Sequence, residues 1–193
     1  MTQRMTHKDK LQLGGIAKMS ITMPTETAHL AVIEGLTGNP DGRTLAPMAI
    51  AQTGGQTVVE GYLHNVFVNQ GLEAALDSMF GDLTAERITH IAVSGDNASV
   101  SATTTDIDPS GAGFSPKATA NVSRTNRTAG GDNTWTQADV SFAVRKVGFL
   151  TGTAKGDVVN IIGGSGNEPF TVDLTSQATF TLTIGIDVTL AAT

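Results

Sequence analysis

The chain has 193 residues, of which 39% are hydrophobic, 16% charged and 5% aromatic, with a formal net charge of −6 and no cysteine. An acidic chain lacks the clustered lysine and arginine that phosphate binding needs, so we expect no nucleic-acid partner. No apolar run approaches the roughly 20 residues of a membrane span, and the absence of cysteine excludes disulfides, thiolate metal sites and cysteine nucleophiles. The 28 threonines and 22 glycines, with so few charges, indicate a mainly β domain rather than a helical bundle.

Residues 1–28 are predicted to form an extended N-terminal arm. Its charge is +2, which leaves −8 for residues 29–193; its basic side chains are Arg4, Lys8, Lys10 and Lys18. Opposite charges suit an arm that lies on a neighbouring copy of the body, although a loose terminus explains the same charges equally well. The apolar residues Met19, Ile21 and Met23 alternate with polar ones and predict a short strand that ends at Pro24. Because the polar residues 1–10 lead into no apolar core, we expect no secretory signal.

Residues 29–193 are predicted to form one β-rich domain. Strands are expected at 29–33 and 45–51, separated by the turn Asn39-Pro40-Asp41-Gly42, and a further strand runs from Thr57 towards Val68.

One short helix is predicted over about residues 70–80. Asn69 suits its N-cap and Gly81 the position after its end, while its apolar residues share one face: Leu72, Ala75, Leu76, Met79 and Phe80. A helix of about three turns is too short to persist alone, so this face is expected to pack on a sheet.

The chain after the helix reads as strands and turns. Buried strands are expected at Ile88–Val93 and Val158–Ile162, and an alternating one at Val140–Val144. The polar stretch Ser94–Thr128 is expected to hide one strand near Ala118–Arg124 and otherwise to form loops. The glycines of residues 163–166 predict a hairpin loop rather than a phosphate cradle, because a strand and not a helix follows them.

The last strand is the clearest in the sequence. Six apolar residues alternate with polar ones or glycine from Phe180 to Leu190, which predicts a half-buried antiparallel strand. Its length of about 36 Å, at about 3.3 Å per residue, suggests that it either bends at Gly185 or extends across a neighbouring subunit. Together these elements predict an antiparallel β-sandwich-like domain with one short packed helix and an extended N-terminal arm.

No residue pattern dictates a chemistry, so we expect no enzyme, no catalytic or metal-binding residue and no cofactor. The four histidines stand without ligand spacing, at His7, His29, His64 and His90. Asp106 and Asp108 resemble part of a calcium loop but lack its distal glutamate, so an exposed turn is the favoured interpretation. Asp96 is expected to cap a local turn. Arg124 and Arg127 either meet an acidic neighbour at an interface or lie in a solvated loop.

Residues 61–76 carry a family resemblance, in the sequence GYLHNVFVNQGLEAAL. This segment resembles an "HN-x-V-x-N-x-GL" element of small virion proteins of tailed bacteriophages, in which a strand runs into a short helix and a further strand like Ile88–Val93 follows. In the family the chain then closes on alternating strands, as here. The glycine of the element, Gly71, is expected to permit close packing at the turn.

The resemblance implies a virion structural protein, and we favour a capsid decoration or cement protein that bridges neighbouring capsid subunits. Its partners would be other copies of itself, as a trimer for example, and the major capsid protein, with synthesis in the host cytoplasm and final location in the virion. The contact residues favoured are the arm charges Arg4, Lys8, Lys10 and Lys18 with the apolar Met19, Ile21 and Met23. The alternatives are a tail-attached fibre, baseplate or adaptor component, and a carbohydrate- or receptor-binding module, for which Trp135 and Tyr62 are the candidate aromatic residues beside the phenylalanines.

Overall fold

A computed structural model describes the backbone of residues 11–24, 49–53, 56–64, 66–71, 73, 87–125, 128–165, 171–172 and 181–192. Side chains are described for residues 68–71, 73, 87–123, 130–165, 171–172 and 181–185. The predicted turn at 39–42 and the predicted boundary at residue 28 lie outside these ranges.

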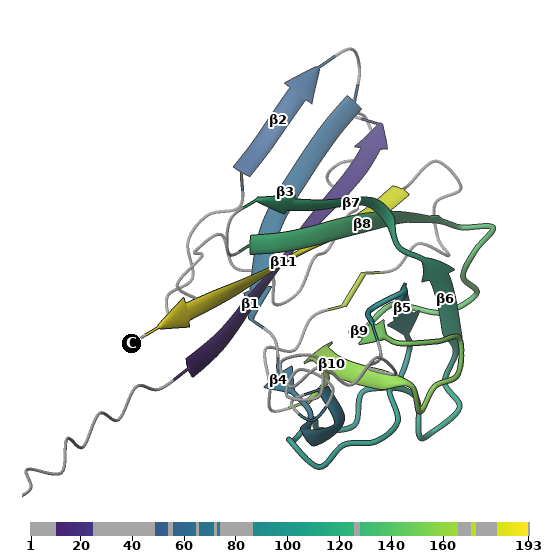
Figure 1. Ribbon diagram of the computed structural model, residues 1–193. Coiled ribbons are helices and arrows are strands. Elements are labelled where there is room, and N and C mark those ends of the chain that lie inside the picture. Colours follow the sequence, from purple (N-terminus) through teal and green to yellow (C-terminus); the bar gives the residue numbers. More distant parts are fainter. Residues whose placement is uncertain are drawn as a thin grey trace, which may run out of the picture.

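Two antiparallel sheets make up the described part of the chain (Figure 1). The six-stranded sheet has the order β2 (Ala49–Thr53), β3 (Gln56–His64), β1 (Leu11–Pro24), β11 (Thr181–Ala192), β8 (Thr128–Thr136) and β7 (Ala120–Thr125). The five-stranded sheet has the order β4 (Val66–Phe67), β10 (Val158–Gly163), β9 (Lys146–Leu150), β5 (His90–Ser94) and β6 (Phe114–Ala118). The predicted mainly β, antiparallel fold is confirmed.

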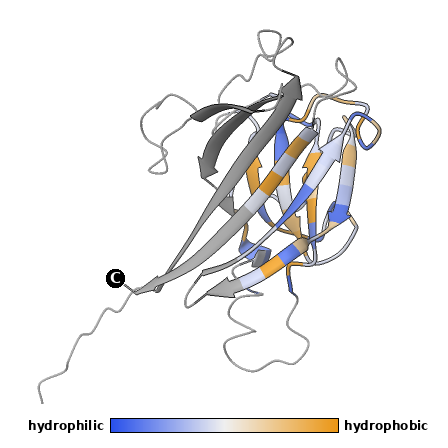
Figure 2. Cartoon of the chain, turned by 90° about the horizontal axis from the view of Figure 1, so that it is seen from above, coloured by the Kyte–Doolittle hydropathy of each residue, from blue (hydrophilic) through white to orange (hydrophobic). Residues whose placement is uncertain are grey.

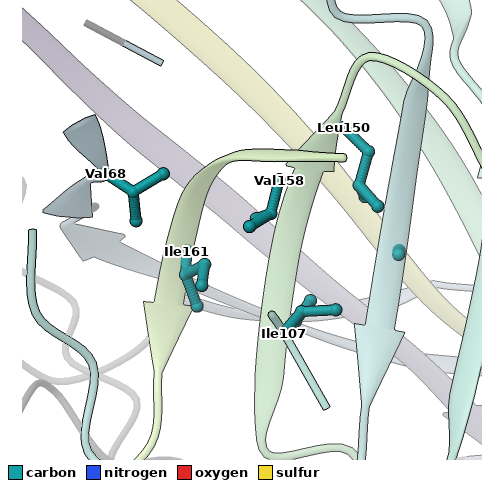
Figure 3. Packing of buried hydrophobic residues seen from close by; sticks show 6 residues of the cluster. Val68, Ile107, Leu150, Val158 and Ile161 are labelled. Atoms are coloured by element: carbon teal, nitrogen blue, oxygen red, sulfur yellow. The ribbon is translucent and has the colours of Figure 1, made fainter. Parts of the chain in front are cut away.

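The five-stranded sheet supplies most of the described core. Every residue of β9 and β10 is buried, and Val68, Ile107, Leu150, Val158 and Ile161 pack together with Ala92 (Figure 3). A Cβ on Gly148 would lie 2.4 Å from the Cδ1 of Ile107. Glycine at position 148 therefore lets the loop that carries Ile107 press directly on the sheet.

Apolar residues of the six-stranded sheet are also buried. Trp135 of β8 is fully buried and is the register partner of Leu182 in β11, which is buried as well. The Trp135 Nε1–H donates to the carbonyl oxygen of Ser115 in β6 at 3.3 Å, so this side chain links the two sheets. Figure 2 shows hydrophobic and hydrophilic residues in the described strands, and in β11 the side chains from Thr181 to Gly185 alternate between half-buried and buried, the period expected of a strand with one buried face.

The strongest strand predictions are confirmed. β5 and β10 fall on the predicted buried runs, and Gly163 and Gly164 take positive φ angles of 90° and 83° in the turn that follows β10. β11 covers the predicted last strand and pairs with β1 from Leu11 to Thr22, in a register that is continuous through Gly185. The length of β11 is thus matched by a strand of the same chain.

The strand expected in the N-terminal segment is present and longer than predicted. β1 ends at Pro24 as expected, but it begins at Leu11 and lies between β3 and β11 in the sheet. The described part of residues 1–28 is therefore paired within this chain.

The predicted helix is described only at its start. Asn69, Gln70, Gly71 and Glu73 are helical, while residues 72 and 74–81 lie outside the described residues. The Asn69 N–H donates to the carbonyl oxygen of Ala102 at 2.8 Å. Gly71 is buried, and a Cβ there would stand 2.1 Å from the carbonyl oxygen of Val159. The expected close packing at Gly71 is confirmed.

Two sequence predictions are wrong. Val140–Val144 was expected to be a strand, but it is a loop with a single bridge between Val144 and Val172. Residues 128–136 form β8, so a strand begins at the end of the polar stretch, with Gly130 and Gly131 inside it and Trp135 near its end. In the polar stretch the predicted strand is found as β7, and a second strand, β6, precedes it.

None of the described helical residues belongs to a segment long and apolar enough to cross a membrane.

Candidate functional site

The predicted contact residues of the arm fall into two groups. Arg4, Lys8 and Lys10 lie outside the described residues. Lys18, Met19, Ile21 and Met23 lie in β1, where the structure describes their backbone. In the register, Met19 pairs with Ile184 and Ile21 pairs with Leu182, two residues whose side chains are buried. That these residues contact another protein stays a prediction.

One of the two predicted arginines lies in the described part of the chain. Arg124 is in β7, an outer strand of the six-stranded sheet, and pairs with Ala129, whereas Arg127 lies outside the described residues. The register of β7 shifts between Ala120 and Ser123. Within this bulge Asn121 takes a φ of 49°, and Val122 has 74% of its surface exposed. Val122, on this bulged outer strand, is therefore the most exposed large hydrophobic side chain among the described residues.

A second feature is a buried ion pair, which the sequence did not indicate. The Nζ of Lys146 in β9 donates to Oδ2 of Asp96, and the two side chains are 0% and 2% exposed. Asp96 Oδ2 also accepts the N–H of Ala98 at 3.0 Å, as the capping prediction requires. Burial alone would raise the pKa of Asp96, but hydrogen bonds from Lys146, Ser110 and Ala98 outweigh it and hold the pKa below its ordinary value of 3.8.

The segment with Asp106 and Asp108 is a turn, as predicted, but it is not an exposed one. Ile107 is fully buried and Asp108 is 2% exposed. The Asp108 carboxylate accepts the N–H groups of Ala112 at 2.9 Å and of Gly113 at 3.4 Å. Its Oδ2 also accepts a hydrogen bond from Lys155 Nζ at 2.6 Å, and this contact raises the pKa of Lys155. The Asp108 carboxylate thus binds backbone N–H groups and the Lys155 ammonium group.

A third ion pair lies beside the buried tryptophan. Lys117 Nζ is 2.8 Å from Asp139 Oδ2, donates to the carbonyl oxygen of Thr134 at 2.7 Å and stands 5.7 Å from the centre of the Trp135 ring. Burial would raise the pKa of Asp139, yet the bonds from Lys117 and from the N–H and hydroxyl of Thr136 hold it low. This cluster joins β6 to the end of β8.

The described histidines and acidic residues do not come together. His90 opens β5, with its Nδ1 2.8 Å from Thr89 Oγ1, and His64 lies in β3, while His7 and His29 are outside the described residues. Over the ranges given above, no three histidine, aspartate or glutamate residues are grouped so that they could hold a metal ion.

No protein-family model, curated protein or solved structure matches the chain.

The ion-pair lysines could not be assigned from the sequence. Lys146 and Lys155 lie 50 and 47 residues from their aspartates, and nothing local marks the pairing. The one usable signal is a lysine inside an otherwise buried run, as in Lys146-Val147-Gly148-Phe149-Leu150, because an unpaired buried lysine is costly.

Proposed function

We propose that this protein is a structural component of a tailed bacteriophage particle, a decoration or cement protein that assembles with copies of itself and bridges neighbouring capsid subunits. The observation that carries the proposal is the form of the segment that resembles phage virion proteins. β3 and β4 lead into the helical residues that begin at Asn69, and β5 follows, in the order that the resemblance implies.

The contacts of this segment support the proposal because they attach residues 68–71 to the five-stranded sheet. The Val68 N–H donates to the carbonyl oxygen of Val159 in β10 at 3.3 Å, and Gly71 abuts the same carbonyl group. A glycine is therefore required at the position where the resemblance has one. The segment acts as a structural join between the two sheets.

The charge pattern gives independent support. Only 16% of the residues are charged, well below the roughly 25% of an ordinary soluble domain. The three described ion pairs each join separate segments of the chain. A surface with few free charges suits contact with neighbouring protein, because charged residues are depleted at the centre of interfaces. In this proposal the protein acts through its interfaces and catalyses no reaction.

The copy number in purified particles tests the location. Quantitative mass spectrometry of the particles made by the encoding phage is expected to give hundreds of copies of this chain, in a fixed ratio to the major capsid protein. A count from a few to some dozens would instead identify a tail-attached fibre, baseplate or adaptor component.

The alternative of a carbohydrate-binding module finds no support at Trp135, one of its two candidate aromatic residues. Such a module needs an exposed aromatic platform, and Trp135 is fully buried and hydrogen-bonded to Ser115. A glycan array probed with the purified chain is expected to show no binding. A saturable signal for one glycan class would favour the receptor-binding module over the cement protein.

A further inference from the structure

The Lys146–Asp96 pair differs from the other two ion pairs in its burial. Its side chains are 0% and 2% exposed, whereas Lys155 is 39% exposed and Lys117 and Asp139 are each 28% exposed. Among the described residues, it is therefore the one ion pair with both partners removed from water.

The backbone holds these two groups together. Lys146 in β9 is the register partner of Ser94, the last residue of β5, and Asp96 follows two residues later. The Asp96 N–H donates to Ser94 Oγ at 3.0 Å, which fixes the turn that brings the carboxylate back over the strand. On the other side, a Cβ on Gly164 would lie 2.8 Å from Lys146 Cε, so the lysine stem is enclosed as well. The amine and the carboxyl group have little freedom to separate.

A buried ion pair carries a desolvation penalty that a neutral product would not carry. Groups that are fixed in contact react as if at effective concentrations of about 10⁵–10⁸ M. Exclusion of water from the pair also protects the product from hydrolysis. These three effects act in the same direction, towards condensation.

We propose that Lys146 and Asp96 join in an intramolecular amide bond. The Lys146 ammonium first passes a proton to the Asp96 carboxylate, which makes both groups neutral. The Nζ lone pair then attacks Cγ, and the C–N bond forms. The hydroxyl group on Cγ leaves with the electron pair of its C–O bond and takes a proton from the nitrogen, so that one water molecule is released. No oxidant, reductant or further reactant is consumed.

Two neighbouring groups are placed to assist this step. The Ala98 N–H, 3.0 Å from Oδ2, would hold in place the oxygen that takes the Lys146 proton and leaves as water. The Ser110 hydroxyl bonds the same carboxylate and can relay the proton from the nitrogen to the leaving oxygen. The resulting bond would fasten the end of β5 to β9 covalently. The inference does not depend on the proposed function.

The test is the mass of the intact, denatured full-length protein, followed by sequencing of its tryptic peptides. The expected mass is below that of the sequence by one water molecule. Trypsin is expected not to cleave after Lys146 and to release a branched peptide in which residues 88–117 are joined to residues 146–155. Full sequence mass with cleavage after Lys146 would overturn the proposal. So would a water loss found in a linear peptide, for example at Asp41-Gly42, where an aspartyl succinimide gives the same mass change.

Variants supply matched controls. In Asp96→Asn the same attack expels ammonia, so the mass is expected to fall by one ammonia molecule. Lys146→Met is expected to retain the full sequence mass. Lys155→Met, which alters the exposed pair, is expected to retain the water loss. Loss of water from the Lys146→Met protein would contradict the assignment.

Discussion

At the scale of single residues, three aspartates fix the described loops. Asp96, Asp108 and Asp139 each accept at least one backbone N–H and each bind one lysine. The sequence indicated Asp96 and the Asp106–Asp108 segment as turn residues because aspartate caps local N–H groups. Their lysine partners could not be predicted, since the pairing depends on how distant segments fold together.

Replacement of Asp108 tests this role. Asp108→Ala leaves the N–H groups of Ala112 and Gly113 without their acceptor and removes the partner of Lys155. We expect the free energy of unfolding in urea to fall by about 2–4 kcal/mol. Asp106→Ala, the matched control, removes one bond to the Asp108 N–H and should cost about 1 kcal/mol. Equal losses in the two variants would show that Asp108 does not hold the loop.

Asp139 gives the stability a pH dependence. Its pKa is lower in the folded protein than the ordinary 3.8, so the unfolded chain binds a proton more readily as the pH falls. The stabilisation by Asp139 is therefore present above about pH 4 and is lost as the pH drops through the folded-state pKa. Asp139→Asn should lower the free energy of unfolding by about 1 kcal/mol at pH 6 and flatten the slope below pH 4. Urea titrations from pH 6 to pH 2 measure both, and parallel curves for the two proteins would exclude the effect.

At the scale of elements, the confirmed strands are those with a strong apolar pattern in the sequence. The wrong predictions concern segments whose secondary structure depends on contacts with distant parts of the chain. β8 has the sequence TAGGDNTWT, which reads as a turn, yet it pairs with β11 on one side and β7 on the other. A Cβ on Gly131 would stand 2.5 Å from Thr119 Cγ2, so the glycine marks the crossing of another segment. Val140 and Val144 are buried as the alternation implied, but they pack from a loop.

Close packing of the helix start is testable at Gly71. In Gly71→Ala the new Cβ collides with the Val159 carbonyl group, which belongs to a buried strand and cannot move aside. We expect a loss of about 1–3 kcal/mol in the free energy of unfolding. Gly156→Ala is the control, because its Cβ would meet only the Thr105 carbonyl oxygen at 3.6 Å, an ordinary contact. Unchanged stability of Gly71→Ala would argue against the observed packing.

At the scale of the whole molecule, the N-terminal segment contains both the predicted contact residues and the strand β1 of the six-stranded sheet. Residues 11–24 form a strand that pairs with both β3 and β11, so a deletion that tests the basic residues of the arm must stop before Leu11. Deletion of residues 1–10 should leave the thermal midpoint of the chain unchanged and weaken its binding to particles that lack it. Deletion of residues 1–18 should unfold the chain, because it removes more than half of β1. Full particle binding by the shorter deletion would show that Arg4, Lys8 and Lys10 make no contact.

The proposed cement role requires a defined position on the particle, which an icosahedral cryo-electron microscopy reconstruction measures directly. Particles of the encoding phage are compared with particles that lack this gene. The account predicts two-sheet density across the boundaries between capsid subunits, repeated over the shell and absent from the mutant. An identical shell in both samples, with the difference confined to the tail, would contradict it.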